Sequence, residues 1–213
     1  MKIQFDNLMP HPLKEIPHGE NSIWKQGFIV EGKERVMLNA HSGKGKTTFT
    51  HIISGIRKDY AGSCLIDGVD SRTYRLKDWE KLRKHRLSIV FQDLQLFDKI
   101  SVRENLLVKN RLTHHKSESE IKDFLDRFGL VSKWDKNCGI LSMGQQQRVA
   151  IIRSLLQPFE MMILDEPFSH LDKENQAIGI KMFNEEAEKH GAGYILTSLG
   201  EDHGNEFTKT LYL

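Results

Sequence analysis

Two patterns of apolar residues alternate along the chain. Short unbroken apolar runs predict buried strands, and they occur at 35–39, 65–66, 88–91, 161–165, 194–197 and 210–213. Between residues 93 and 158 the apolar positions instead follow a helical repeat, as in Ile121, Phe124, Leu125 and Phe128. Strands that alternate with helices predict an α/β protein with a parallel sheet. We expect residues 93–158 to form a helical insertion in it.

Helix boundaries can be predicted from capping residues. Ser117 and Glu120 form a capping box, and Gly129 suits the end of that helix. Ser142 and Gln145 repeat the pattern before a helix that we expect to end at Gln157-Pro158. Other helices are predicted over Lys46–Ser54, ending at Gly55, and around Lys181–His190.

Composition excludes several classes of protein. Lys and Arg number 31 and Asp and Glu 29 in 213 residues, so bulk charge does not favour binding to nucleic acid. Unbroken apolar runs reach only four residues, whereas a membrane span needs about 20. The first residues lack the apolar core of a secretory signal, and two cysteines, Cys64 and Cys138, fit a reducing cytosol. The ten histidines show no metal-binding spacing, and we expect His114-His115 in a solvated loop.

A loop rich in glycine and lysine follows the strand predicted at 35–39. Glycines allow backbone N–H groups to turn around phosphate oxygens, and the following helix adds its positive end. Lys46 can reach the β- and γ-phosphates, and the Thr47 hydroxyl can bind Mg²⁺. Ala40 stands where this P-loop pattern has its first glycine, and a positive φ there would cost about 1 kcal/mol. The predicted nucleotide contacts are Ala40, His41, Ser42, Gly43, Lys44, Gly45, Lys46, Thr47 and Thr48.

The strand predicted at 161–165 ends in two acids. Ligands of open α/β sheets bind at the carboxyl ends of the strands. Asp165 therefore suits a magnesium ligand, and Glu166 could polarise a water molecule that attacks the γ-phosphate.

A third motif, Leu141-Ser142-Met143-Gly144-Gln145, resembles the signature of the ATP-binding cassette (ABC) family. Phe91-Gln92-Asp93 resembles that family's Q-loop, and Ser169–Asp172 its D-loop. The motifs stand in the family's order, over about residues 32–197. The chain is similar to the compact ATPase subunits of lipoprotein-release and macrolide-export transporters.

The resemblance implies one nucleotide-binding domain over residues 1–213. It would be a P-loop NTPase fold with a RecA-like core (1–92 and 159–213), a helical subdomain (93–158) and a small N-terminal β region. Implied cofactors are ATP and Mg²⁺, with Glu166, Gln92 and Ser198 as catalytic residues and Thr47, Gln92 and Asp165 at the metal. Further implied nucleotide contacts are Ser142, Met143, Gly144, Gln145 and Asp172.

The implied partners are a second cassette, most simply another copy of this chain, and an integral membrane permease. The cassettes would dimerise head-to-tail around two ATP molecules, and the permease would hold the chain on the cytoplasmic face of the cell membrane. No direct contact with nucleic acid and no membrane span of its own are expected. Specificity in such systems lies largely in the membrane subunit, so the sequence does not predict the transported substrate.

The chain departs from the family at three places. Thr197-Ser198 stands where the family has a Thr-His pair, so the switch imidazole is absent, with His203 as an alternative donor. Losing one oriented donor can cost roughly 10²–10³ in rate. Met143 replaces a signature glycine. The residue that stacks on adenine is open among His11, His18 and Trp24, with core packing the alternative for Trp24.

The leading hypothesis is an ATP-hydrolysing cassette that drives a membrane transporter. A second is a nucleotide-gated regulator or scaffold with little turnover, motivated by Ala40, Met143 and Ser198. A third is an ABC ATPase that acts on ribosomes or DNA, although the chain has neither a second cassette nor a long insertion.

Overall fold

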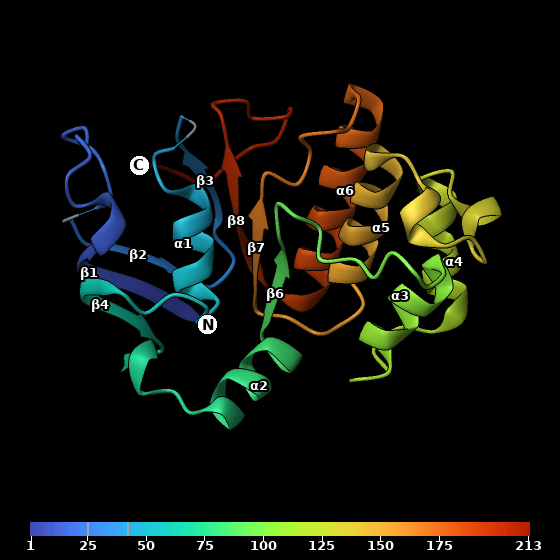
Figure 1. Cartoon of the computed structure of the whole chain (residues 1–213), viewed down its shortest axis with the longest axis horizontal. Coiled ribbons are helices and arrows are strands. Elements are labelled where there is room, and N and C mark those ends of the chain that lie inside the picture. The colour runs from blue at the N-terminus through green and yellow to red at the C-terminus, as the bar shows by residue number, and fades with distance from the viewer. Residues whose placement is uncertain (25, 42) are drawn as a thin grey trace.

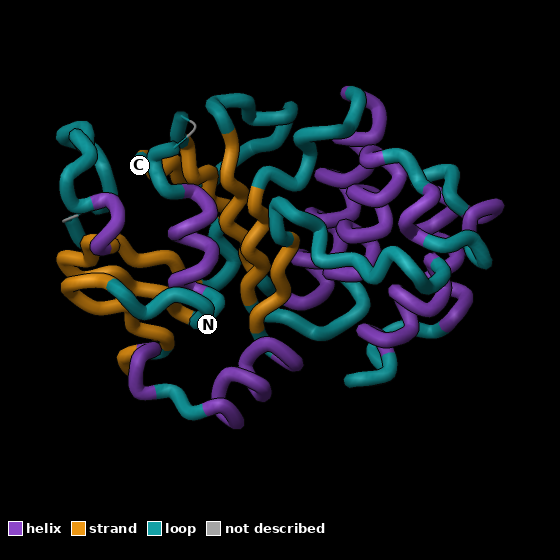
Figure 2. Tube along the Cα trace, viewed as in Figure 1, coloured by secondary structure: helices purple, strands orange, loops and turns teal. Residues whose placement is uncertain are grey.

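Two β-sheets and a group of helices make up the computed structural model of the chain, which describes residues 1–24, 26–41 and 43–213 (Figure 1). An antiparallel sheet lies beside a parallel sheet, and most of the helices lie on the far side of the parallel sheet (Figure 2). No helix within the described ranges is long and apolar enough to cross a bilayer.

The parallel sheet has the strand order β6-β7-β8-β3-β9. Its register places Asp165 opposite Thr197 and Asn39 opposite Ser198, so the ends of β7, β8 and β3 meet at one edge. Its strands are β3 (Arg35–Asn39), β6 (Leu87–Val90), β7 (Met161–Asp165), β8 (Gly193–Ser198) and β9 (Lys209–Tyr212).

The antiparallel sheet has the order β2-β1-β4-β5 and packs against α1. Its strands are β1 (Lys2–Pro10), β2 (Phe28–Glu31), β4 (Tyr60–Ile66) and β5 (Val69–Asp70). The α-helices of the described residues are α1 (Lys46–Ile53), α2 (Leu76–His85), α3 (Val102–Asn110), α4 (Glu118–Arg127), α5 (Met143–Ser154) and α6 (Lys173–His190).

Strand β7 shows why the parallel sheet is buried on both faces. Its alternate side chains Met161 and Ile163 join the core shared with α1 and the antiparallel sheet. Met162 and Leu164 join the core shared with α3–α6. Because successive side chains of a strand point to opposite faces, a continuous apolar run is what this position requires.

The predicted α/β architecture, with its parallel sheet and N-terminal β region, is confirmed. The capping boxes at Ser117 and Ser142 are present, each with the predicted partner three residues later. The predicted end of α5 at Gln157-Pro158 was wrong, since the helix ends at Ser154. The Ser88 hydroxyl of β6 donates to the Ser154 carbonyl at 2.6 Å, so the sheet takes over a carbonyl that another helical turn would use.

Candidate nucleotide site

The P-loop connects the end of β3 to the start of α1. Gly43 has φ +78° and Gly45 φ +107°, values that favour glycine. A Cβ on Gly45 would lie 2.5 Å from Leu13 Cδ1 and 3.2 Å from the Trp24 ring, so a larger residue there would also force the Leu13 side chain to move. Ala40 does not belong to the described residues with positive φ, and the strain considered for its methyl group does not arise.

Trp24 is a buried residue that makes a hydrogen bond to this loop. Its indole N–H donates to the Lys44 carbonyl at 3.2 Å, and its ring is 2% exposed and stacked near Phe5. Trp24 therefore has the core position that was the alternative to adenine stacking. The sequence pattern contained no signal for its hydrogen bond to the loop.

Lys46 and the end of β7 face each other across the loop. Lys46 is 6% exposed, donates to the Ala40 carbonyl at 2.9 Å and lies 3.1 Å from Glu166 Oε1. The Thr47 hydroxyl donates to Gln92 Oε1 at 3.0 Å, and Gln92 Nε2 donates to Glu166 Oε2 at 3.5 Å. Four predicted site residues from three distant segments are thus connected in one polar chain.

A hollow of about 230 Å³ lies over this polar chain. Its lining residues are Leu13, Gly43, Gly45, Lys46, Thr47, Thr48, Gln92 and Glu166. Of the other predicted loop contacts, His41 is exposed, and the Lys44 ammonium donates to the Pro17 carbonyl at 2.9 Å. Ser42 lies outside the described residues.

Asp165 is buried at the end of β7, with 1% of its surface exposed. Its Oδ1 accepts a hydrogen bond from the Thr197 hydroxyl at 2.9 Å, whereas Oδ2 has no protein partner. Burial raises the pKa of Asp165, and the Thr197 hydrogen bond offsets only part of that rise. A buried oxygen without a hydrogen-bond partner, on a carboxylate that lies near the Thr47 side chain, fits a hard cation such as Mg²⁺.

Thr197 holds both acids, a role that the sequence analysis missed. Its hydroxyl donates to Asp165 and accepts from the Glu166 backbone N–H at 3.0 Å. The parallel register of β7 and β8 places it there. The Thr197-Ser198 pair was noted only for its second residue, although a threonine opposite an acidic strand end was an available signal.

Glu166 adopts a left-handed backbone conformation with φ +47°, which is strained for a residue with a side chain. Gln147 of α5 is fully buried and donates to the Glu166 carbonyl at 3.1 Å and to the Ser169 hydroxyl at 3.2 Å. Its Oε1 accepts from the His170 N–H at 2.8 Å. One side chain of the signature helix thus fixes the backbone on both sides of Pro167.

The residues that resemble the signature lie at the start of α5, apart from the P-loop of the same chain. Strands β6, β7 and β8 lie between α1 and α5 (Figure 1). Ser142 caps α5 and Gln145 accepts from the Ser142 N–H, while Met143 is 50% exposed. Gly144 fits closely, because a Cβ there would lie 2.8 Å from the His170 carbonyl. Asp172 is exposed and caps α6 by accepting from the Asn175 N–H at 2.8 Å.

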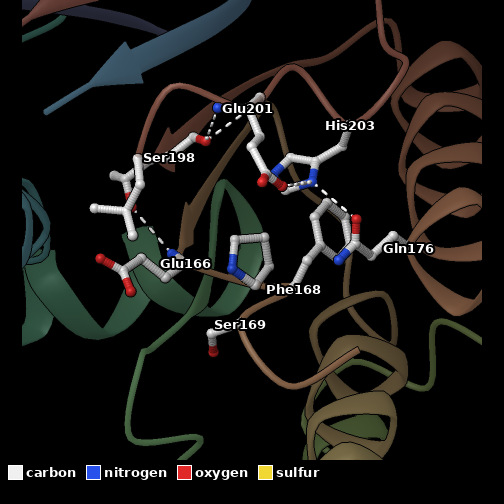
Figure 3. A pocket seen from close by; sticks show the side chains of 10 residues that line it. Glu166, Phe168, Ser169, Gln176, Ser198, Glu201 and His203 are labelled. Carbon is white, nitrogen blue, oxygen red and sulfur yellow. Dashed lines mark hydrogen bonds and ion pairs between the residues drawn. The ribbon is translucent and has the colours of Figure 1, made fainter. Parts of the chain in front are cut away.

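Ser198 lies beside a cavity of about 240 Å³ that Glu166 also lines (Figure 3). Its hydroxyl donates to the Glu201 carbonyl at 2.7 Å and accepts from the Glu201 N–H, which closes a turn. His203 lines the same cavity, where its Nδ1 lies 3.1 Å from Gln176 Oε1 and its ring packs edge-on against Phe168. Among the described residues, neither side chain makes a hydrogen bond or ion pair with Lys46 or Glu166.

Comparisons with known proteins show what the chain is similar to. The family described as "ABC transporter" matches residues 26–169. The lipoprotein-releasing system ATP-binding protein LolD of Buchnera aphidicola subsp. Schizaphis graminum is 35% identical over 66% of this chain and 63% of its own. The phosphonates import ATP-binding protein PhnC of Frankia casuarinae is 36% identical over 70% of this chain and 63% of its own. The chain spans about three fifths of the length of these curated relatives.

Solved structures show the same fold. The dimeric structure of MJ0796, described as a bacterial ABC transporter cassette, has a TM-score of 0.84 at 22% identity and covers 99% of this chain and 94% of its own. A second structure of MJ0796, a post-hydrolysis state bound to ADP and Pi, has a TM-score of 0.81 at 21% identity, over the same shares of the two chains.

Proposed function

Because the chain belongs to the ABC transporter family, we propose that it is an ATP-binding and ATP-hydrolysing cassette that powers a separate membrane permease. The observation that carries this proposal is the polar chain Thr47–Gln92–Glu166–Lys46 beside the unpartnered oxygen of Asp165. It combines a phosphate-binding cation, a carboxylate base and a cation ligand around one hollow.

Lys46 and Glu166 carry the proposed chemistry. The glycines of the loop and the start of α1 offer N–H groups to the phosphates, and Lys46 offers its charge. A triphosphate in the hollow competes with Glu166 for Lys46, whose ammonium now lies 3.1 Å from Glu166 Oε1. The released carboxylate can then accept a proton from a water molecule that attacks the γ-phosphate.

Thr47, Gln92 and Asp165 are the residues that would hold Mg²⁺. The ion, when bound, neutralises charge on the phosphates. Asp165 is suited to it because its Oδ2 is buried and has no partner. Thr197 fixes the orientation of the Asp165 carboxylate by its hydrogen bond, and Gln92, a proposed ligand of the ion, also donates a hydrogen bond to Glu166.

A second cassette would complete the site. The start of α5 offers N–H groups and the Ser142 side chain at an exposed helix end, where an anion is favoured. In the same chain this end lies across the sheet strands from α1 (Figure 1). We propose that Ser142, Met143, Gly144 and Gln145 of one copy contact ATP held by the P-loop of another, with Asp172 at the interface.

A groove of about 350 Å³ between α1, β6, α3 and α5 supports the proposal that the chain binds a membrane protein. Exposed apolar side chains line it, namely Ile56, Phe97, Val108 and Leu112, each about half exposed. We propose that an apolar-faced segment of the permease docks there and holds the chain at the cytoplasmic face of the membrane. Phe97→Asp and Leu112→Asp should abolish co-purification with a membrane protein, and Leu76→Asp, at an exposed residue elsewhere, should not.

Glu166→Gln tests the catalytic proposal. The variant should lose about 100-fold or more in Mg-ATP turnover, since a general base contributes roughly 10²–10⁴. It should still bind ATP and elute as a dimer with ATP in size-exclusion chromatography. Glu188→Gln, at an exposed residue of α6, is the control. Unchanged turnover of Glu166→Gln, or a wild-type protein inactive even with its membrane partner, would refute the enzymatic proposal.

A second candidate function, a nucleotide-gated regulator with little turnover, is favoured by the Ser198 contacts. Because its hydroxyl is used in the turn with Glu201, Ser198 offers no donor to a phosphate. Ser198→His would place an imidazole beside the cavity that Glu166 lines. A rise of roughly 10²–10³ in kcat would show that native turnover is held low, and an unchanged kcat would count against this candidate.

A further inference from the structure

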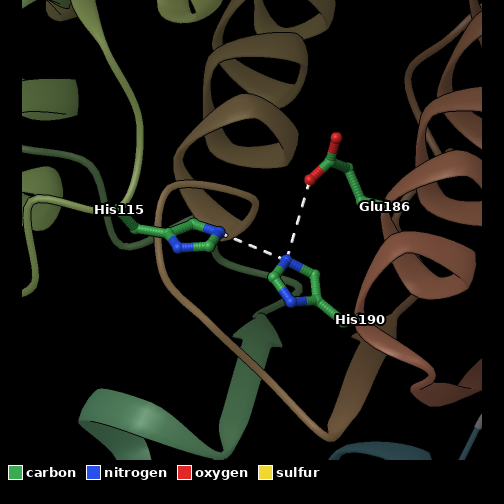
Figure 4. A group of neighbouring side chains, drawn as sticks. All are labelled: His115, Glu186 and His190. Atoms are coloured by element: carbon green, nitrogen blue, oxygen red, sulfur yellow. Dashed lines mark hydrogen bonds and ion pairs between the residues drawn. The ribbon is translucent and has the colours of Figure 1, made fainter.

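Three metal-ligating side chains from two distant segments converge away from the nucleotide site (Figure 4). His115 belongs to the loop between α3 and α4, whereas Glu186 and His190 lie one turn apart on α6. His115 Nε2 lies 3.2 Å from His190 Nε2, and His190 Nε2 lies 3.8 Å from Glu186 Oε2. The three ligand atoms all lie within 4.8 Å of one another.

This arrangement corrects the expectation that His114-His115 is a solvated loop. His114 is exposed, but His115 is half-buried and turned toward α6. The loop is fixed by two hydrogen bonds, from Asn110 Nδ2 to the Lys116 carbonyl at 2.7 Å and from the Lys116 N–H to Asn110 Oδ1 at 3.0 Å. No sequence spacing shows a ligand pair formed by a loop and a helix 75 residues later.

The distances suit a tetrahedral cation. With metal–nitrogen bonds of about 2.0–2.1 Å, two ligand atoms of a tetrahedral zinc ion lie about 3.3 Å apart. The two imidazole nitrogens are already at 3.2 Å. The Glu186 oxygen, at 3.8 Å from His190 Nε2, needs to approach that nitrogen by about half an ångström, and all three ligand atoms lie within 4.8 Å of one another. Two histidines and one carboxylate with an open fourth position are a frequent zinc ligand set.

Two lysines compete with a cation for Glu186. Lys116 Nζ lies 2.7 Å from Oε2, and Lys189 Nζ lies 2.7 Å from Oε1. A carboxylate oxygen has two lone pairs, so Oε2 can accept from Lys116 and bind a metal at the same time. The repulsion from two ammonium groups nevertheless weakens binding, and removing Lys116 should strengthen it.

We propose that His115, Glu186 and His190 form a zinc-binding site that ties the α3–α4 loop to α6. The site is separate from the proposed nucleotide chemistry, because none of its residues lines the hollow over the P-loop. A bound ion would cross-link the helical segment to a helix that packs on the parallel sheet. Zinc should therefore also raise the unfolding temperature of the chain.

The experiment titrates zinc alone into the full chain, freed of metal with a chelator and without nucleotide, against a chromophoric zinc indicator. His115→Ala and His190→Ala should each weaken binding at least about tenfold, since even residues that only orient ligands contribute that much. His114→Asn, at the exposed neighbour, should bind zinc as the wild type does. Lys116→Met should bind zinc more tightly than the wild type.

Circular dichroism of each variant would establish that it is folded. Equal zinc affinity in wild type, His115→Ala and His190→Ala would overturn the proposal, as would the absence of stoichiometric binding by the wild type. Weaker binding by Lys116→Met, with its fold intact, would also contradict the arrangement, because the lysine would then not be a competitor.

Discussion

Gln147 is the residue whose replacement best tests the geometry of the site, because it touches no proposed ligand. It is fully buried and makes three hydrogen bonds, to the Glu166 carbonyl, the Ser169 hydroxyl and the His170 N–H. Gln147→Leu keeps a similar volume and removes all three. The Ser169 hydroxyl keeps a contact with His170 Nδ1 at 3.0 Å, and the Glu166 carbonyl keeps the Ser169 N–H as a donor at 3.3 Å, so the His170 N–H is the backbone group that loses its partner.

The cost can be worked from these contacts. An unpaired buried backbone N–H costs about 1–3 kcal/mol, and each of the two other lost hydrogen bonds contributes about 0.5–1.5 kcal/mol. Because the exposed side chain of His170 allows water to approach, the lower part of that range, about 2–4 kcal/mol in total, is expected. Glu166 is held at φ +47°, a conformation that costs about 1 kcal/mol or more. Without Gln147 the backbone can relax and move the carboxylate, which should lower kcat about tenfold for each 1.4 kcal/mol released.

The assays are urea denaturation for stability, and ATPase kinetics with direct ATP-binding measurements for function. We expect kcat to fall while the Kd for ATP changes little, because Lys46 and the loop N–H groups do not contact Gln147. Gln146→Leu is the matched control. That side chain donates to the Cys138 and Leu141 carbonyls, so its loss should lower stability but leave kcat unchanged. Equal kcat values in the wild type and both variants would refute the reasoning that Gln147 positions Glu166.

Three further predictions concern other parts of the chain. Hydrogen bonds from Arg86 lower the pKa of Glu160 from 4.5 to about 2, so the stabilisation by this pair is present above pH 4.5 and is lost as the pH falls toward 2. When the free energy of unfolding in urea is measured against pH, Glu160→Gln should therefore show a smaller loss of stability than the wild type over that range. Gly45→Ala should weaken ATP binding about tenfold or more in a binding titration. The new Cβ would lie 2.5 Å from Leu13 Cδ1, and a backbone with φ +107° costs about 1–2 kcal/mol for alanine. Burial raises the pKa of the Cys64 thiol to about 12, so the thiol should resist a thiol reagent at pH 8 in the native protein and react with it in urea. Reaction at equal rates in the native and the urea-unfolded protein would contradict the burial of Cys64.

Local patterns were sufficient where one segment contains the whole signal. The apolar run at 161–165 predicted β7, and Ser117 with Glu120 predicted the start of α4. The P-loop, the acidic strand end and the signature could each be identified from neighbouring residues. The meeting of the P-loop and the acidic strand end at one sheet edge followed from the rule that parallel strands end together, whereas the signature lies apart from them at the start of α5.

Other features depend on residues that are distant in the sequence. Trp24 contacts the P-loop carbonyl of Lys44, and Gln147 contacts the backbone around Pro167. Each of these residues looks like ordinary core or helix surface in its own segment. The same holds for His115, a loop residue whose partner His190 lies on α6.

The sequence by itself therefore determined the fold class and the family, and it predicted which residues offer phosphate, metal and proton chemistry. Only the tertiary structure decided how these residues are held: Thr197 between the two acids, Gln147 behind Glu166, and the Ser198 hydroxyl in the turn with Glu201. The physical reason is that chemistry and local conformation depend on residue type and near neighbours. Orientation depends on hydrogen bonds across the sheet and between helices, which form only when distant segments pack.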